Sequence, residues 1–329
     1  MRILVLDDYQ QAALGLADWT RLGAQVDVLH HTPADDDERV RRFAGYQAIV
    51  AMRERTPFSA ALLQRLPDLR LLVTTGMANA AIDLPACAAA GVTVCGAPGS
   101  KASAGATAEM AWALILALAK RLLPSAQALH DGRWQPLMAQ SLAGRTLGLV
   151  GLGRLGQRMA GIGTAFGMRV IAWSPHLSAE RASAAGAEAV DKHTLFAASD
   201  VVSLHLVLAD ATRGIVDRAA LQAMPPHALL VNTSRGALVD REALLDLLRA
   251  GRIAGAGLDV FHREPLPADD ALLALPNVLA SPHLGYVTDD NLRAFYGNVV
   301  DAIAAWQAGA PIRVLAAPSA PSPQSLSNG

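Results

Sequence analysis

The sequence predicts an α/β protein built from doubly wound parallel sheets. Short apolar strands alternate with amphipathic helical stretches along almost the whole chain. A glycine-rich turn follows one strand and opens a helix, as in nucleotide-binding α/β domains. With 329 residues, of which 52% are hydrophobic, the chain is long enough for two domains with buried cores.

The strands are expected where apolar runs are bounded by turn residues. Three are predicted early in the chain, at Ile3–Leu6, Ala48–Met52 and Leu71–Thr74. Six more are predicted later, at Leu147–Val150, Arg169–Trp173, Val201–His205, Ala228–Asn232, Gly257–Phe261 and Val278–Ser281. Long helices are predicted over residues 104–121 and from Thr288, a candidate N-cap, to Gly309, a candidate C′ residue.

Composition limits the partners that we expect. A formal net charge of −1 gives no reason to expect nucleic acid or an anionic membrane as a partner. Two cysteines form no disulfide framework, and no paired His/Cys spacing predicts a metal site. The apolar N-terminal run is too short for a signal peptide, and the longest apolar run is about half of a membrane span. We therefore expect a soluble cytoplasmic protein.

The glycine-rich turn is the clearest local motif. Gly151 allows a tight turn, Gly153 lets a pyrophosphate approach the backbone, and Gly156 lets helix and strand pack closely. The start of the following helix offers N–H donors to the phosphates. A purely structural turn is the alternative, but the strand–turn–helix context favours a dinucleotide site.

The residue at the end of the second strand leaves the choice of dinucleotide open. An acidic residue there would bind the ribose 2′-hydroxyl of NAD and repel the 2′-phosphate of NADP. The position falls at Ser174, which cannot repel a phosphate. His176 or Arg181 would add positive charge nearby, so the sequence predicts NAD or NADP without deciding between them.

Three polar residues follow predicted strands in the same half of the chain. Arg235 lies in Asn-Thr-Ser-Arg-Gly, Glu264 in His-Arg-Glu-Pro, and His283 in Ser-Pro-His-Leu-Gly. Arginine can bind a carboxylate and polarise a carbonyl, and histidine can donate a proton to a developing alkoxide. A carboxylate beside that histidine favours the imidazolium and fixes its orientation. Together they predict hydride transfer at a carbonyl, although each residue alone could be structural.

Taken together, Gly151–Gly156, NTSRGALVD, GLDVFHREPLP and SPHLG resemble the D-isomer-specific 2-hydroxyacid dehydrogenases, which include 3-phosphoglycerate, glyoxylate/hydroxypyruvate and D-lactate dehydrogenases. The resemblance covers about residues 1–315. It implies a Rossmann cofactor domain (100–285) inserted into a flavodoxin-like substrate domain (1–99 and 286–315), with a cleft closed by hinge motion. Residues 316–329 are expected to form a disordered tail. No regulatory domain is expected, and the helix from Ala104 resembles a dimer contact, which implies a homodimer.

The resemblance also assigns roles to individual residues. Arg235, Glu264 and His283 match the substrate arginine, the orienting glutamate and the acid/base histidine. Further substrate contacts are implied at Arg53 and in the carboxylate loop of Gly76, Met77, Ala78 and Asn79. Cofactor contacts are implied at Gly151, Gly153, Arg154, Leu155, Gly156, Ser174, Leu206, Thr233, Ser234, Asp259 and Gly285.

Two readings of function follow from these motifs. The first is an oxidoreductase that moves a hydride between NAD(P)H and C2 of a small 2-oxo or 2-hydroxy acid. The alternative is a non-catalytic dinucleotide-sensing protein of the same fold. Ser174 and the loop Gly-Met-Ala-Asn, where many members carry a second glycine, depart from the family's common pattern and leave cofactor and acid open.

Overall fold

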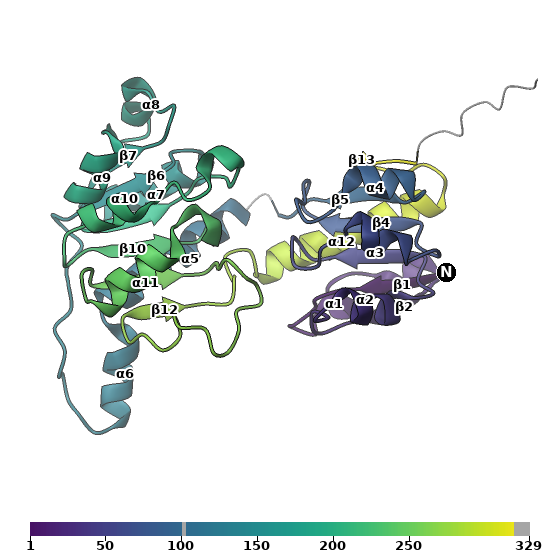
Figure 1. The fold of residues 1–329 in the computed structure, drawn as a ribbon, viewed down its shortest axis with the longest axis horizontal. Coiled ribbons are helices and arrows are strands. Elements are labelled where there is room, and N and C mark those ends of the chain that lie inside the picture. Colours follow the sequence, from purple (N-terminus) through teal and green to yellow (C-terminus); the bar gives the residue numbers. More distant parts are fainter. Residues whose placement is uncertain (101–102, 319–329) are drawn as a thin grey trace, which may run out of the picture. The chain divides into compact units, whose positions relative to one another are not determined.

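A computed structural model describes residues 1–100 and 103–318, and its chain divides into two compact units (Figure 1). Unit 1 consists of Met1–Lys101 and the chain from Asp289 onward, and unit 2 consists of Ala102–Thr288. The chain thus leaves unit 1 and later returns to it. These limits fall close to the predicted domain boundaries, whereas the binding role of each unit stays a prediction.

Unit 1 contains a six-stranded sheet in the order β13-β5-β4-β3-β1-β2. Its strands are β1 (Arg2–Val5), β2 (Gln25–Val28), β3 (Ala48–Ala51), β4 (Leu71–Thr75), β5 (Thr93–Ala97) and β13 (Val314–Ala316). β1 to β5 are parallel, and their order is the flavodoxin-like 2-1-3-4-5. The helices are α1 (Ala13–Leu16), α2 (Asp36–Phe43), α3 (Ala60–Gln64), α4 (Leu84–Ala89) and α12 (Asp289–Gln307).

Three strands of unit 1 were not predicted. β2 is a half-exposed edge strand with a polar residue inside it, and β5 contains a glycine and a threonine that interrupt the apolar run. β13 pairs antiparallel with β5, so this sheet is not purely parallel. Ala316, the first residue of the predicted tail, belongs to β13, and residues from 319 onward lie outside the described residues.

Unit 2 contains a seven-stranded parallel sheet in the order β12-β11-β10-β9-β6-β7-β8. Read from the other edge and numbered within the unit, this order is 3-2-1-4-5-6-7, which extends the Rossmann order by one strand. The strands are β6 (Thr146–Val150), β7 (Arg169–Trp173), β8 (Glu188–Ala189), β9 (Val201–Leu204), β10 (Leu229–Asn232), β11 (Gly255–Leu258) and β12 (Val278–Ala280). The helices are α5 (Ser103–Ala119), α6 (Leu122–His130), α7 (Arg154–Ala165), α8 (Ala179–Ala184), α9 (Lys192–Ala198), α10 (Arg218–Ala223) and α11 (Arg241–Arg249).

Two boundaries in unit 2 differ from the sequence prediction. The helix predicted over 104–121 ends at Ala119, because Arg121 adopts a left-handed backbone with φ of 51° and α6 then starts in a new direction. The strand predicted at Gly257–Phe261 lies at Gly255–Leu258. Asp259 is therefore the first residue of a loop at the carboxyl end of the sheet.

Each unit has its own apolar core. In unit 2, two clusters form around the sheet; one contains Phe196, Leu230 and Leu245, and the other packs Trp112 and Ile115 of α5 against β6. In unit 1, Phe43, Phe58 and Leu72 lie in a third cluster. Within the described part of the chain, no helix is both long and apolar enough to cross a membrane.

Candidate active site

The glycine-rich turn lies where the strand order of unit 2 reverses, between β6 and β9. Gly151 has φ of 101°, and a Cβ there would overlap the backbone of His205. A Cβ at Gly156 would overlap the carbonyl oxygen of Gly151, so α7 packs directly on the turn. Gly153 differs, because it is exposed and a Cβ there would meet nothing within 4 Å. The turn therefore leaves open space beside Gly153.

The start of α7 borders this open space. Gly153 is its N-cap residue, and among the described residues no side chain caps the helix. Its first N–H groups and the helix dipole are therefore available for an anion. Arg154 is exposed and Leu155 is partly buried beside them, and their role as cofactor contacts stays a prediction.

Two buried polar groups near this edge lack a partner among the described residues. The Thr233 hydroxyl, just after β10, is buried and accepts or donates no hydrogen bond there. Both ring nitrogens of His205, just after β9, are also buried and unsatisfied, and burial lowers the pKa of His205 to about 3. Buried polar groups are usually satisfied, so a ligand or water can complete the hydrogen bonds of these two.

Two other predicted cofactor residues have different surroundings. The Ser234 hydroxyl donates to the carbonyl oxygen of Leu204 at 2.9 Å, which ties the ends of β9 and β10 together. Leu206 is partly buried, and one of its methyl groups would contact a Cβ at Gly151. Ser234 thus has a structural hydrogen bond that the sequence did not reveal.

Ser174 stands directly after β7 and is partly buried. Arg181 lies in α8, and its Nη1 donates to the carbonyl oxygen of His176 at 3.4 Å, so the guanidinium folds back over the turn that begins at Ser174. Within the described part of the chain, no carboxylate pairs with Arg181. This corner of unit 2 therefore carries a hydroxyl and an exposed cation.

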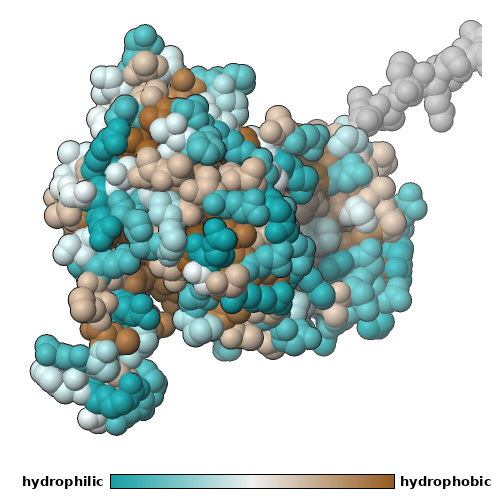
Figure 2. All heavy atoms as spheres, turned by 60° about the vertical axis from the view of Figure 1, so that its left-hand side comes forward, coloured by the Kyte–Doolittle hydropathy of each residue, from teal (hydrophilic) through white to brown (hydrophobic). Residues whose placement is uncertain are grey.

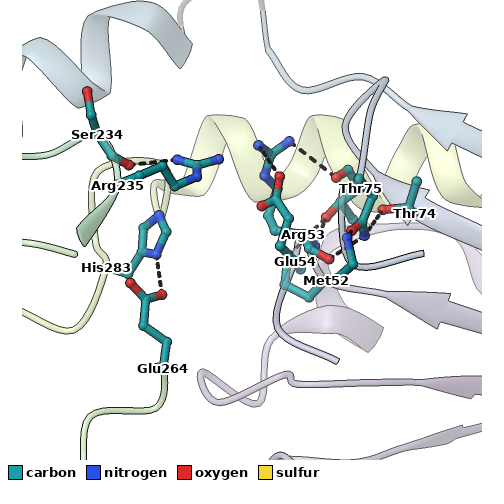
Figure 3. A network of polar contacts seen from close by, with 11 residues as sticks. Met52, Arg53, Glu54, Thr74, Thr75, Ser234, Arg235, Glu264 and His283 are labelled. Carbon is teal, nitrogen blue, oxygen red and sulfur yellow. Dashed lines mark hydrogen bonds and ion pairs between the residues drawn. The ribbon is translucent and has the colours of Figure 1, made fainter. Parts of the chain in front are cut away.

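The turn after β10 is organised by the buried side chain of Asn232. Its Nδ2 donates to the carbonyl oxygen of Arg235 at 2.9 Å, and its Oδ1 accepts from the Ser234 N–H at 3.0 Å. Arg235 Nη1 donates to the Ser234 carbonyl oxygen at 2.7 Å (Figure 3). A Cβ at Gly236 would overlap the backbone of Phe261, so this turn packs against the loop that carries Glu264. Asn232 was not predicted as a site residue.

Glu264 and His283 form a direct pair. Oε2 of Glu264 lies 2.6 Å from Nδ1 of His283, and Figure 3 shows the imidazole between Glu264 and Arg235. Oε1 of Glu264 accepts from the Phe261 N–H at 2.9 Å, which fixes the carboxylate. The Glu264 and His283 side chains are 24% and 18% exposed, so the pair is shielded yet reachable by a ligand. The predicted trio therefore does meet at one edge of unit 2.

Asp259 anchors the loop that carries His283. Its fully buried carboxylate accepts from the Ser281 hydroxyl at 2.6 Å and from the Leu284 and Gly285 N–H groups at 2.7 and 2.8 Å. Burial raises the pKa of Asp259, and these hydrogen bonds and nearby His283 oppose that rise. His283 itself has φ of 55°. The predicted cofactor residues Asp259 and Gly285 thus meet each other, in a contact that the sequence did not reveal.

The carboxyl edge of unit 1 carries the predicted substrate residues. Arg53 has φ of 51°, and its N–H donates to the Thr75 hydroxyl at 2.9 Å. Its guanidinium packs against Gly76, where a Cβ would overlap it. Asn79 is buried, and its Nδ2 donates to the Arg53 carbonyl oxygen at 2.6 Å. Arg53 and the loop of residues 76–79 therefore form one unit of structure.

The backbone donors in this loop are unequal. The Gly76 N–H already donates to the Ala97 carbonyl oxygen at 2.5 Å, so it is committed to the sheet. Met77 and Ala78 are exposed, and their N–H groups have no acceptor within the described part of the chain. Of the four predicted loop positions, Met77 and Ala78 can therefore offer amides to an anion, whereas Asn79 supports Arg53.

The comparisons with known proteins identify the family of the chain. The family model "D-isomer specific 2-hydroxyacid dehydrogenase, NAD binding domain" matches residues 112–285, more than half of the chain. The chain belongs to this family. A hydroxypyruvate reductase of Thermotoga maritima is 36% identical over 260 residues, which cover 78% of this chain and 83% of that relative.

Other relatives are longer. A D-3-phosphoglycerate dehydrogenase of Archaeoglobus fulgidus is 34% identical over 88% of this chain, which spans about half (54%) of that relative.

The crystal structure of a phosphoglycerate oxidoreductase from Vibrio cholerae has a TM-score of 0.89 and 40% identity, covering 94% of this chain and all of that one. These matches bear out the predicted family and fold.

The NAD-binding assignment of this family fits the residues of unit 2. The open space at Gly153, the uncapped start of α7 and the unsatisfied Thr233 hydroxyl lie at the end of the sheet where nucleotides bind in open α/β folds. Backbone donors and a helix dipole suit a pyrophosphate. The residues present can therefore hold a nicotinamide dinucleotide.

Proposed function

We propose that this protein is an NAD(P)H-dependent reductase of small 2-oxo acids that forms the D-2-hydroxy acid. The observation that carries the proposal is the pair of His283 Nδ1 and Glu264 Oε2 at 2.6 Å, beside Arg235 and on the same sheet as the dinucleotide turn. A shielded acid/base pair next to a guanidinium suits reduction of a carbonyl that bears a carboxylate.

Each residue of the trio has a distinct role in this proposal. Arg235 binds the substrate carboxylate and polarises the carbonyl, since its planar fork matches two oxygen atoms. His283 gives the proton on Nε2 to the developing alkoxide, while Glu264 accepts from Nδ1–H and stabilises the imidazolium. The bound dinucleotide supplies the hydride. His283 must then regain a proton from solvent, which its 18% exposure permits.

The same proposal assigns the remaining contacts. Gly151, Gly153, Arg154, Leu155, Gly156, Ser174, Leu206, Thr233, Ser234, Asp259 and Gly285 would form the cofactor site of unit 2. In unit 1, Arg53 and the amides of Met77 and Ala78 would bind the carboxylate, with Gly76 and Asn79 shaping the loop. This makes unit 1 the substrate-binding domain and unit 2 the cofactor-binding domain.

For the cofactor we propose that NADPH is accepted at least as well as NADH. Ser174 brings no negative charge, and Arg181 lies over the same turn without a carboxylate partner in the described residues. The test is the ratio of kcat/KM for the two cofactors. Ser174→Asp should shift this ratio toward NADH, and Arg181→Ala should weaken use of NADPH alone. A wild-type ratio that strongly favours NADH would overturn this part.

We further propose a cytoplasmic homodimer that forms through an arm of unit 2. The arm comprises α6 and the segment to residue 140, and Figure 2 shows brown and tan side chains among teal and white ones on this lobe. Leu123, Leu129, Trp134 and Met138 are exposed, Trp134 by 77% and Met138 by 90%. Exposed apolar clusters of this kind favour association. Light scattering should give a dimer mass, and Leu129→Glu with Met138→Glu should give a monomer.

The central experiment is a panel of 2-oxo acids with NADH and NADPH, followed by absorbance at 340 nm. Turnover of at least one acid, with the D-enantiomer as product, is the expected result. Dinucleotide binding without turnover of any acid would instead favour a dinucleotide-sensing protein of the same fold. An L-product would contradict the proposed stereochemistry while leaving the reductase assignment intact.

A further inference from the structure

The imidazole of His283 contacts an aromatic side chain from the segment in which the chain leaves unit 2. Tyr286 follows His283 in the segment that leads to α12. The two ring centroids lie 5.4 Å apart, and the ring planes meet at 82°. Perpendicular ring pairs at this separation attract each other through their quadrupoles. The contact lies entirely within unit 2.

The hydrogen bond to Glu264 does not fix the tilt of the imidazole plane. It anchors Nδ1, but the torsion between Cβ and the ring is broad for histidine, so the ring plane can rock about the anchored atom. Rocking about Nδ1 moves Nε2, which is the atom that would meet the substrate oxygen. A ring packed at a right angle against the imidazole restricts this motion.

The backbone around Tyr286 is itself held in place. The preceding Gly285 donates its N–H to Asp259 at 2.8 Å, and its carbonyl oxygen accepts from the Thr107 hydroxyl of α5 at 2.9 Å. The following Val287 donates its N–H to the Leu284 carbonyl oxygen at 2.9 Å. The ring of Tyr286 therefore projects from a fixed segment and can act as a rigid stop.

We propose that Tyr286 is a positioning residue that fixes the plane of the His283 imidazole. Glu264 then sets the direction of the ring and Tyr286 sets its tilt, so Nε2 is aimed before the substrate binds. This inference rests on the proposed function of His283 as the proton donor. Because proton transfer depends steeply on alignment, loss of the ring should lower kcat and leave binding almost unchanged.

The test compares Tyr286→Phe and Tyr286→Leu in the full chain, with an acid that the wild type reduces. Phe keeps the ring, so kcat should stay within about twofold, whereas Leu should lower kcat about tenfold, equivalent to about 1.4 kcal/mol. KM and the Kd of NAD(P)H should change less than about twofold. The solvent isotope effect on kcat should rise in the Leu variant, because proton transfer becomes slower. Phe166→Leu, which alters the ring pair of Phe166 and Trp112, is the matched control and should retain kcat.

Two outcomes would overturn the inference. A raised KM with unchanged kcat in the Leu variant would make Tyr286 a substrate contact, and equal losses in both variants would assign the effect to the hydroxyl. A second readout needs no turnover: the ¹⁵N signals of the His283 ring, assigned by their loss in His283→Ala, should broaden or shift in the Leu variant. Unchanged ring signals there would also overturn it. Failure of the wild type to reduce any acid would instead overturn the proposed function and leave this readout valid.

Discussion

The two units build their carboxyl edges in different ways at the same topological point. In unit 2, the strand order reverses between β6 and β9, and the chain there presents glycines and an uncapped helix start. In unit 1, it reverses between β1 and β3, and the chain presents the buried carboxylate of Asp7 and the turn that contains Arg53. The reversal point of unit 2 therefore presents backbone N–H groups and open space, whereas that of unit 1 presents polar side chains.

The proposed function accounts for this difference by assigning a different ligand to each edge. A pyrophosphate is large and evenly charged, so several N–H groups and a helix dipole suit it, and any Cβ in the way is a cost. A small carboxylate needs a few directed donors. In unit 1, Asn79 and Thr75 hold the backbone of Arg53. In unit 2, Asn232 holds the turn of Arg235. Glu264 pairs with His283, and Asp259 holds the loop that carries it. The predictions below test whether chemistry and binding are divided in this way.

The largest effect should come from His283. His283→Ala removes the proposed proton donor and should lower kcat about 10³-fold, within the usual range for general acid catalysis. Steady-state kinetics with the preferred acid measures this, and His193→Ala, an exposed histidine of α9, is the control. Arg53→Ala should instead raise KM about tenfold with little change in kcat. Near-native turnover in His283→Ala would break the assignment of chemistry to unit 2.

Asp259 should have the next largest effect. Asp259→Asn replaces one of the two accepting oxygen atoms by an NH2 group, so at least one of the three hydrogen bonds is lost and a donor faces a donor. This should free the His283 loop and lower kcat about tenfold. Hydrogen bonds to a charged group contribute about 2 kcal/mol, so the midpoint of thermal unfolding should also fall. Ser281→Ala removes one of the three hydrogen bonds and should have a smaller effect on both. Equal effects of the two variants would show that the carboxylate does not hold the loop.

Alanine substitutions in the glycine-rich turn should distinguish glycines that allow packing from the glycine that allows the dinucleotide to approach. Gly156→Ala places a Cβ against the Gly151 carbonyl oxygen, so both thermal stability and dinucleotide affinity should fall. Gly153→Ala meets nothing within 4 Å, so stability should hold while affinity falls about tenfold, or about 1.4 kcal/mol. Gly161→Ala, also without neighbours within 4 Å, is the control in the same helix. Calorimetric titration with NADH and NADPH measures affinity. Unchanged affinity in Gly153→Ala would contradict the backbone site.

Much of the fold could be predicted because its signal is local. Buried central strands such as β3 and β10 lie in apolar runs, and the turn residues beside them mark their ends. β2 and β13 could not be found this way, since they are edge strands whose burial depends on a partner strand distant in sequence. β11 was predicted to start two residues late, because its glycines pack against α5 and hide the start of the strand.

The candidate site was predicted to a similar depth. Arg235, Glu264 and His283 could be named because their chemistry is visible in the residue types and their place after strands is visible in the pattern. The residues that hold them could not. Asn232 acts through a turn, Asp259 through a loop more than twenty residues away, and Gly76 loses its N–H to Ala97 across the sheet. Such contacts exist only in the folded chain, so no local pattern announces them.

The smallest effect concerns unit 1, where Asp7 lies at the point at which the strand order reverses. It should appear in the pH dependence of stability. Asp7 has φ of 59° and accepts from the Thr56 hydroxyl at 2.9 Å and from the Thr32 hydroxyl. Burial raises the pKa of Asp7, so the folded chain binds this proton more tightly than the unfolded chain does. By linkage, its contribution to stability is greatest below the unfolded value and is lost as pH rises through the folded pKa.

Asp7→Asn keeps the shape but cannot ionise, so its stability relative to the wild type should improve from pH 4 to pH 7. We expect a relative gain of about 2 °C in the unfolding midpoint, as for a change below about 1 kcal/mol. Thermal unfolding of both proteins at several pH values measures it, and Asp18→Asn, an exposed cap of a short 3-10 helix, is the control. A relative loss as pH rises would mean that the folded chain favours the ionised carboxylate. Arg55 and Arg39, whose charges lower the pKa of Asp7, would then outweigh burial, and Asp7 would hold a fixed negative charge near these two arginines.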